Sequence, residues 1–221
     1  MKPFASGDRK DAELLAGLQV GDLGLNEINP FFFAEPLAPL VAARKAKRSI
    51  DIKEVVAHVR AVDRHFHRLK TTSPIKKNQT PILLIEGVGG LLVPLGPDFS
   101  VLDLIQSLRP SVVVVARNKL GTINHSLLTI RALQEARAYV GRNTRSVGRL
   151  RVRPETRSLK LVLVDQKLPD PSAFSNAPIL RKLLAPLPVF SLPFFRGNCQ
   201  SVKGIERIEK KIEKTLAQIL R

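Results

Sequence analysis

The pattern of apolar positions divides the chain into short unbroken apolar runs and longer periodic stretches. Four runs, at residues 82–86, 111–116, 159–165 and 187–193, are rich in Val, Ile, Leu and Phe. Strands of a parallel sheet are covered by helices on both faces, so they read as continuous apolar runs instead of alternating ones. We therefore expect the first two runs to be strands buried on both faces, and the other two to be further strands.

Along much of the rest of the chain, apolar side chains recur every three or four residues, which predicts amphipathic helices. The expected helices cover residues 12–18, 50–69, 100–105, 126–133 and 205–219. Asp11 is a plausible N-cap for the first of them, because its carboxylate can accept hydrogen bonds from free backbone N–H groups. Ser100 and Asp103 resemble a capping box.

A strand, a glycine-containing loop and a helix follow one another twice in the middle of the chain. This succession is typical of a doubly wound, mostly parallel sheet with helices on both faces, so we predict an α/β fold. A length of 221 residues suits one domain, residues 1–221. Residues 134–160 depart from the pattern, because they are basic and carry few large apolar side chains, and we expect an insertion or loop there.

Composition narrows the class of protein further. Lys and Arg number 36 against 19 Asp and Glu, and the formal charge of +17 favours anionic partners without specifying one. Nucleic acid, anionic membrane surfaces and nucleotide phosphates all fit this charge. The single cysteine is compatible with a reducing compartment, and no apolar run is long enough to span a bilayer. We therefore expect a soluble, cytoplasmic protein that does not act at a membrane.

The first apolar run ends in Glu86, followed by Gly87-Val88-Gly89-Gly90. A carboxylate at the end of a buried strand is costly unless a metal ion, a cation or backbone N–H groups pair with it. Ligand crevices of open parallel sheets lie at the carboxyl ends of the strands, so Glu86 marks a candidate site. A glycine-rich strand exit whose Glu points to solvent is the alternative.

Four groups of motifs follow one another along residues 1–133. They are Lys2-Pro3-Phe4-Ala5-Ser6-Gly7 with Asp11-Ala12, Ile28-Asn29-Pro30 with Pro36-Leu37-Ala38-Pro39, Glu86-Gly87-Val88-Gly89-Gly90, and Leu120-Gly121-Thr122-Ile123-Asn124-His125. The ordered set resembles ATP-dependent dethiobiotin synthase, although each motif alone is weak. The resemblance implies a P-loop NTPase-like fold, a homodimer and a role in biotin biosynthesis.

The same resemblance implies a reaction. With ATP and magnesium, the family closes a cyclic urea on 7,8-diaminononanoate with CO2. A substrate amine becomes a carbamate, which attacks the γ-phosphate of ATP. The neighbouring amine then closes the carbamic-phosphoric anhydride with loss of phosphate. Such chemistry depends on cations placed around a crowded set of anions.

Roles for single residues also follow from the resemblance. Lys2 would hold the carbamate and the transferring phosphoryl group, and Ser6 would bind the substrate. Asp11 and Glu86 would be the two carboxylates at magnesium, an ion that prefers oxygen ligands. The helix start around Asn124 would belong to the dimer interface and receive a substrate carboxylate. The nucleotide-binding residues that the resemblance implies are Asp11, Glu86, Gly87, Val88, Gly89, Asp165, Gln166, Pro193, Phe194 and Phe195.

One part of the family pattern is missing. The family has a strand, a glycine-rich phosphate loop and a helix before the Lys-Pro segment. These 221 residues contain no Gly-x-x-x-x-Gly-Lys-Ser/Thr motif and no Gly-Lys pair. We therefore expect an N-terminally truncated synthase without the first strand, phosphate loop and first helix, in which Met1 is an internal methionine and activity is impaired.

Two alternative functions stay open. A basic nucleic-acid-binding protein would use Arg145, Arg149, Arg151 and Arg153, but no nucleic-acid motif accompanies these arginines, and we do not expect nucleic acid to be the partner. A related ATPase of the P-loop class would act on another carboxylate or amine.

Overall fold

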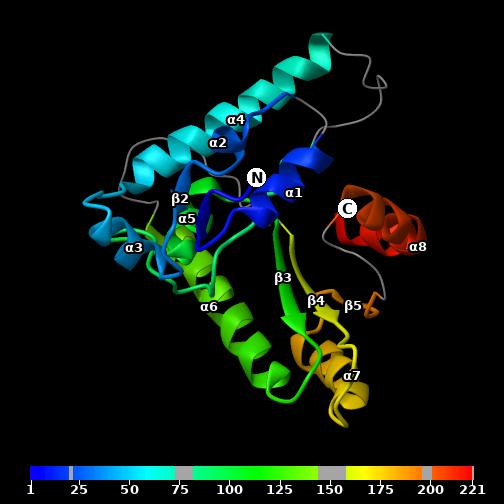
Figure 1. Ribbon diagram of the computed structural model, residues 1–221. Coiled ribbons are helices and arrows are strands. Elements are labelled where there is room, and N and C mark those ends of the chain that lie inside the picture. Colours follow the sequence, from blue (N-terminus) through cyan, green and yellow to red (C-terminus); the bar gives the residue numbers. More distant parts are fainter. Residues whose placement is uncertain (20–21, 73–81, 144–157, 196–200, 221) are drawn as a thin grey trace. The chain divides into compact units, whose positions relative to one another are not determined.

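The computed structural model describes residues 1–19, 22–72, 82–143, 158–195 and 201–220. They fall into two compact units, residues 1–108 and residues 109–221, and each unit is considered by itself (Figure 1). The units divide the range that we predicted to be one domain, and the single domain stays a prediction. None of the helices in the described ranges is long and apolar enough to cross a membrane.

The first unit is built around two short parallel strands. Strand β1 (Phe4–Ser6) pairs with β2 (Phe31–Phe33) so that Phe4 lies opposite Phe31 and Ser6 lies opposite Phe33. Five helices accompany the strands in this unit: α1 (Lys10–Leu18), α2 (Leu25–Ile28), α3 (Pro39–Lys45), α4 (Ile52–Thr72) and α5 (Val101–Leu108). We did not predict β1 or β2, because three residues are too few to show a strand period.

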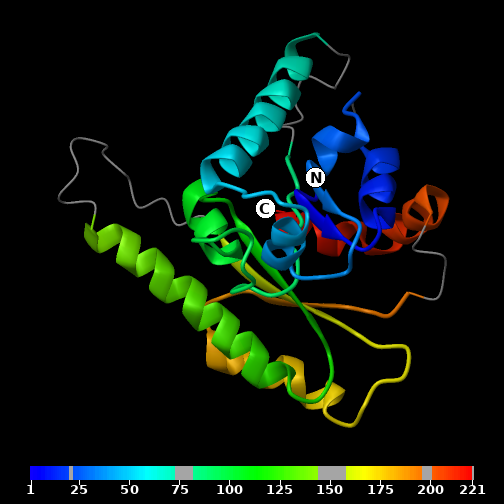
Figure 2. The ribbon, with the colours of Figure 1, turned by 60° about the vertical axis from the view of Figure 1, so that its left-hand side comes forward.

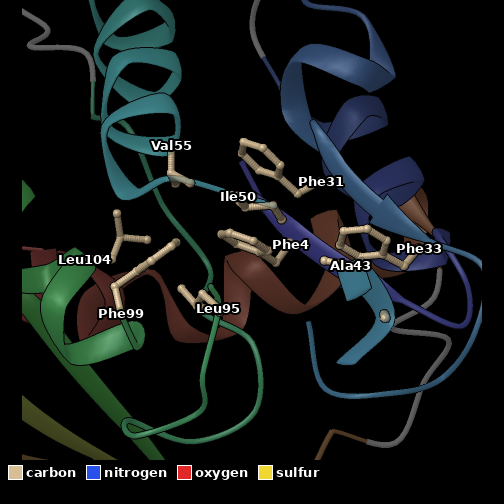
Figure 3. Close-up of a cluster of buried hydrophobic side chains, with 10 residues drawn as sticks. Phe4, Phe31, Phe33, Ala43, Ile50, Val55, Leu95, Phe99 and Leu104 are labelled. Atoms are coloured by element: carbon tan, nitrogen blue, oxygen red, sulfur yellow. The ribbon is translucent and has the colours of Figure 1, made fainter. Parts of the chain in front are cut away.

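Phenylalanines from both strands form the core of this unit. Phe4 stacks on Phe31 with the ring centroids 4.9 Å apart, and both side chains are almost fully buried. Figure 3 shows Ile50, Leu95 and Phe99 gathered around them. Burial of each such aromatic side chain contributes about 2–3 kcal/mol, so this cluster fixes the strands from which Lys2 and Ser6 extend.

The run at residues 82–86 is extended but is not a strand of a sheet. Leu83 and Ile85 pack on the apolar cluster that contains Met1, whereas Ile82 and Leu84 are each 64% exposed. The Met1 nitrogen donates to the Leu84 carbonyl, and the Glu86 N–H donates to the Met1 carbonyl at 2.9 Å. The prediction of a strand buried on both faces was wrong, because the described residues cover only the face of the run with Leu83 and Ile85.

The second unit contains a three-stranded parallel sheet in the order β3 (Val112–Arg117), β4 (Leu159–Val164), β5 (Val189–Leu192). Helices α6 (Thr122–Asn143) and α7 (Ala173–Leu184) lie along one face (Figure 2), where Leu161 and Leu163 are fully buried. Successive residues of a strand point to opposite faces. Lys160 therefore points to the other face, where its Nζ donates to the Ile219 carbonyl of α8 (Val202–Leu220) at 2.6 Å. This unit has the α/β character, with helices on both faces, that the sequence predicted.

Several local predictions can be compared with these elements. The capping box is confirmed, because the Ser100 N–H donates to Asp103 Oδ2 at 2.8 Å and the Asp103 N–H donates to Ser100 Oγ at 3.4 Å. The N-cap of α1 is Arg9, so the assignment of Asp11 as N-cap was wrong, and Asp11 lies in the first helical turn.

Two further differences concern the second unit. Val113 and Val115 on β3 are 38% and 65% exposed, so full burial of this strand was a wrong prediction. Val114, on the opposite face of the same strand, packs against the core that contains Leu161 and Leu180. Helix α6 continues to Asn143, so the first part of the predicted insertion at 134–160 is helical. Residues 144–157, with the four arginines of the nucleic-acid alternative, lie outside the described residues.

Candidate functional site

Three charged side chains meet in the first unit although they are far apart in sequence. The Lys2 ammonium donates to Asp11 Oδ2 at 2.6 Å and to Glu86 Oε1 at 2.7 Å. Lys2 precedes β1, Asp11 lies in the first turn of α1, and Glu86 ends the extended run at 82–86. The structure therefore brings together the lysine and both carboxylates of the predicted magnesium site.

Backbone hydrogen bonds hold these segments side by side. The Lys2 N–H donates to the Ile28 carbonyl at 3.0 Å. On the other side, the Glu86 N–H donates to the carbonyl of Met1, the residue before Lys2. The segment that carries Lys2 is thus fixed on one side by the end of α2 and on the other by the run that carries Glu86. The alternative reading, a glutamate that only points to solvent, does not fit this contact with Lys2.

Lys2 and its partners differ in exposure. The Lys2 side chain is 12% exposed, whereas those of Asp11 and Glu86 are 66% and 47% exposed. Burial by itself lowers the pKa of Lys2, but hydrogen bonds and charge attraction from Asp11 and Glu86 outweigh it and raise that pKa above the ordinary lysine value. Both carboxylates stay partly open to solvent, so a further cation can approach them.

The donor set fits magnesium better than a metal enclosed by protein. The described part of the chain contains no group of three or more His, Cys, Asp or Glu side chains that could hold a metal. Magnesium is usually held by one or two carboxylates and takes its remaining ligands from water and substrate phosphates. Lys2 engages one oxygen of each carboxylate, Asp11 Oδ2 and Glu86 Oε1, and both side chains are partly exposed, which suits this kind of coordination.

The predicted glycine loop directly follows Glu86. Gly89 has φ +64°, and a Cβ there would lie 2.7 Å from Val93 Cγ2, so this position requires glycine. A Cβ at Gly87 would meet Val101 at an ordinary 3.7 Å. Val88 packs against the phenylalanine core. The loop is therefore anchored at Val88 and Gly89, while the backbone at Gly87 can be approached closely.

Ser6 ends β1 opposite Phe33, and Gly7 follows it with φ +91°. A Cβ at Gly7 would lie 3.1 Å from the Cβ of Pro36, so a side chain there would crowd the proline segment. The two matched motifs that contain Ser6 and Pro36 are thus in contact, although more than twenty residues separate them.

The remaining predicted site residues belong to the second unit. Asn124 lies in the first turn of α6, and Pro193, Phe194 and Phe195 follow β5, with Phe194 43% exposed. Asp165 and Gln166 follow β4; Asp165 Oδ1 accepts a hydrogen bond from Asn118 Nδ2 at 2.8 Å, and Gln166 Nε2 donates to the Val164 carbonyl at 3.0 Å. These residues gather at the carboxyl ends of the strands and at the start of α6.

The sequence analysis missed a buried polar network beside Asp165. Asn118 and Asn176 are 4% and 2% exposed, and Asn176 Nδ2 donates to Asn118 Oδ1 at 2.9 Å. Asp170 accepts hydrogen bonds from Ser172 and from the Leu120 N–H. These bonds hold the pKa of Asp170 below its usual value, and the bond from the Ser172 side chain has the largest effect. Asn118 directly follows β3 and lies two residues after the predicted strand at 111–116, so its position near the end of a predicted strand was the available signal.

The parallel strands, the flanking helices and the lysine–carboxylate centre define a P-loop NTPase-like α/β protein. The chain belongs to the AAA domain family, whose model matches residues 1–147. This range includes Lys2, Ser6, Asp11, the loop at 86–89 and Asn124 but ends before Asp165.

Individual relatives of known name are more specific than the family model. The chain is 39% identical over 134 residues to an ATP-dependent dethiobiotin synthetase of Bacillus licheniformis, an alignment that covers 58% of this chain and 51% of the relative. It is 37% identical over 134 residues to that of Akkermansia muciniphila (61% and 56% covered) and 35% identical over 135 residues to that of Bacillus subtilis strain 168 (59% and 52% covered). The resemblance to dethiobiotin synthase is confirmed. The chain spans about half the length of these relatives.

Proposed function

We propose that the chain acts as an ATP- and magnesium-dependent cyclo-ligase. It would form dethiobiotin from 7,8-diaminononanoate and CO2 through a carbamic-phosphoric anhydride. The contact of Lys2 with both Asp11 and Glu86 carries the proposal. It joins, in one place, the cation and the two carboxylates that the resemblance implies. All three residues lie in the range that the AAA domain model matches.

Lys2 would act as a fixed cation and not as a base. Its pKa is raised by the two carboxylates, so the ammonium keeps its proton at neutral pH. A protonated, largely buried ammonium stabilises the negative charge that develops on a carbamate and a phosphoryl group. Ser6, at the end of β1, would contribute a hydroxyl to the substrate.

Asp11 and Glu86 would hold the magnesium ion. When bound, this ion would supply positive charge to the phosphates of ATP. The backbone of residues 87–89 would lie against the nucleotide, since Gly87 has no side chain to obstruct the approach and Gly89 fixes the turn.

The resemblance also assigns roles to residues of the second unit. Asn124 and the N–H groups that begin α6 would receive a substrate carboxylate in a homodimer, and the adenine end of ATP would lie near residues 165–166 and 193–195. The motif of the phosphate loop is not among the 221 residues, so we propose that the chain alone transfers phosphoryl groups poorly. A cytoplasmic location belongs to the same proposal.

Growth without biotin tests the function. A strain that lacks dethiobiotin synthetase would express either the 221-residue chain or the chain preceded by the genomic codons upstream of Met1. We expect growth with the extended chain, none with its Lys2→Gln variant, and weak or no growth with the short chain. Lys10→Gln is the matched control, because Lys10 is exposed and lies 3.8 Å from Asp8.

Three outcomes would overturn parts of the proposal. Full rescue by the short chain would show that no upstream phosphate loop is needed. Phosphate release from ATP that does not depend on diaminononanoate, with no dethiobiotin detected by mass spectrometry, would favour the related ATPase. Growth with the Lys2→Gln variant would remove Lys2 from the mechanism.

A further inference from the structure

We infer that Asn29, held by Arg9, is a positioning residue that places the Lys2 ammonium between Asp11 and Glu86. The inference rests on the proposed function, in which that ammonium is the catalytic cation. Asn29 does not touch the carboxylates. It acts through the backbone of Lys2 and, through Arg9, on the start of the helix that carries Asp11.

The Asn29 side chain binds the peptide groups beside Lys2. It is 1% exposed, and its Nδ2 donates to the Lys2 carbonyl at 2.8 Å and, more weakly, to the Pro3 carbonyl at 3.5 Å. The residue before it, Ile28, accepts the Lys2 N–H. Both backbone polar groups of Lys2 are therefore held by two consecutive residues at the end of α2.

Arg9 determines which way the Asn29 amide points. Arg9 Nε donates to Asn29 Oδ1 at 3.1 Å, and Nη2 donates to the Asn29 carbonyl at 2.9 Å. A guanidinium has only donors, so it must face the amide oxygen, and this leaves the amide NH2 toward Lys2. The guanidinium also stacks on Phe32, with 4.9 Å from Cζ to the ring centroid, and donates to Asn26 Oδ1 at 3.1 Å.

The same arginine lies two residues before Asp11 and is the N-cap of α1. The half-buried Arg9 and the buried Asn29 together therefore connect the backbone of Lys2 with the start of the helix that carries Asp11. The Lys2 ammonium can make its contacts of 2.6 and 2.7 Å only if the Lys2 backbone and the helix of Asp11 are both in place. Because phosphoryl transfer depends on positioning, a displacement of this ammonium by about 1 Å would cost on the order of a hundredfold in rate.

The hydrogen bonds of the Lys2 ammonium give a test that needs neither nucleotide nor substrate. NMR of the full chain at one mildly acidic pH would detect them as couplings between Lys2 Nζ and the carboxylate carbons of Asp11 and Glu86, with the Nζ resonance assigned through Lys2→Arg. In Asn29→Ala we expect at least one of the two couplings to be lost, because the ammonium no longer lies between both carboxylates. Asn26→Ala is the matched control: it removes one Arg9 contact, leaves the Asn29 amide in place, and should keep both couplings.

Both couplings retained in a folded Asn29→Ala variant would overturn the inference. If circular dichroism shows that this variant does not fold, Arg9→Lys takes its place, since it keeps the charge but loses the fork that orients Asn29. If neither variant folds, the pair belongs to the scaffold and the inference is also overturned. Because the coupling measurement involves no catalysis, its result is independent of the growth test.

Discussion

At the scale of single residues, the protonation of Lys2 links the site to stability. The partners of Lys2 raise its pKa in the folded chain above the value in the unfolded chain, even though burial works in the opposite direction. A raised pKa means that the folded state binds the proton more tightly. The contribution of the ammonium is then fully present below the unfolded pKa of about 10.4 and is lost as pH rises through the folded pKa.

Urea unfolding at a series of pH values tests whether stability is lost as pH rises. The free energy of unfolding of the wild type should fall more steeply above about pH 10 than that of Lys2→Met, because only the wild type loses the charge between Asp11 and Glu86. Lys10→Met should follow the wild type, since Lys10 is 82% exposed. Parallel curves for wild type and Lys2→Met would show that the carboxylates do not hold the proton on Lys2.

At the scale of elements, the loop after Glu86 has one position that requires glycine, Gly89, and one that has room for a side chain, Gly90. Ala at position 89 would have to adopt φ +64° and place its Cβ 2.7 Å from Val93. A Cβ at Gly90 would meet no atom within 4 Å. We expect Gly89→Ala to lower the free energy of unfolding by at least about 1–2 kcal/mol and Gly90→Ala to change it by less than about 0.5 kcal/mol.

Denaturant unfolding of the two alanine variants measures this difference. Equal stabilities would mean that the loop can shift without strain. Isothermal titration with Mg²⁺ on the same proteins would then show whether a displaced loop also displaces Glu86, since the proposal predicts weaker binding in Gly89→Ala only.

The same elements show what the sequence could and could not predict. The order of the motifs identified Lys2, Asp11 and Glu86, because each of them lies in a short motif that resembles one of the dethiobiotin synthase family. Asn29 belongs to such a block too, but its role depends on Arg9, and no spacing rule joins those two residues. Burial was the least predictable property: the run at 82–86 is as apolar as β4, yet only β4 has covering helices and strands on both sides.

At the scale of the whole molecule, each unit has a core of its own. In the first, Phe31 is 2% exposed within the phenylalanine cluster; in the second, Leu163 is fully buried between the sheet and its helices. A sequence of 221 residues suggested one domain from length alone, and length does not reveal how many separate cores form. The number of units that unfold independently is therefore a question of cooperativity.

Native-state hydrogen exchange on two core variants answers that question. Phe31→Ala should destabilise by about 3–5 kcal/mol and Leu163→Ala by about 2–5 kcal/mol, because each leaves a cavity. If the cores unfold independently, Phe31→Ala accelerates exchange in residues 1–108 and leaves β4 protected, and Leu163→Ala does the reverse. The predicted single domain, residues 1–221, leads us to expect the other result, faster exchange throughout both units in either variant. A response confined to one unit would show that the two units unfold independently and would overturn the prediction of one domain.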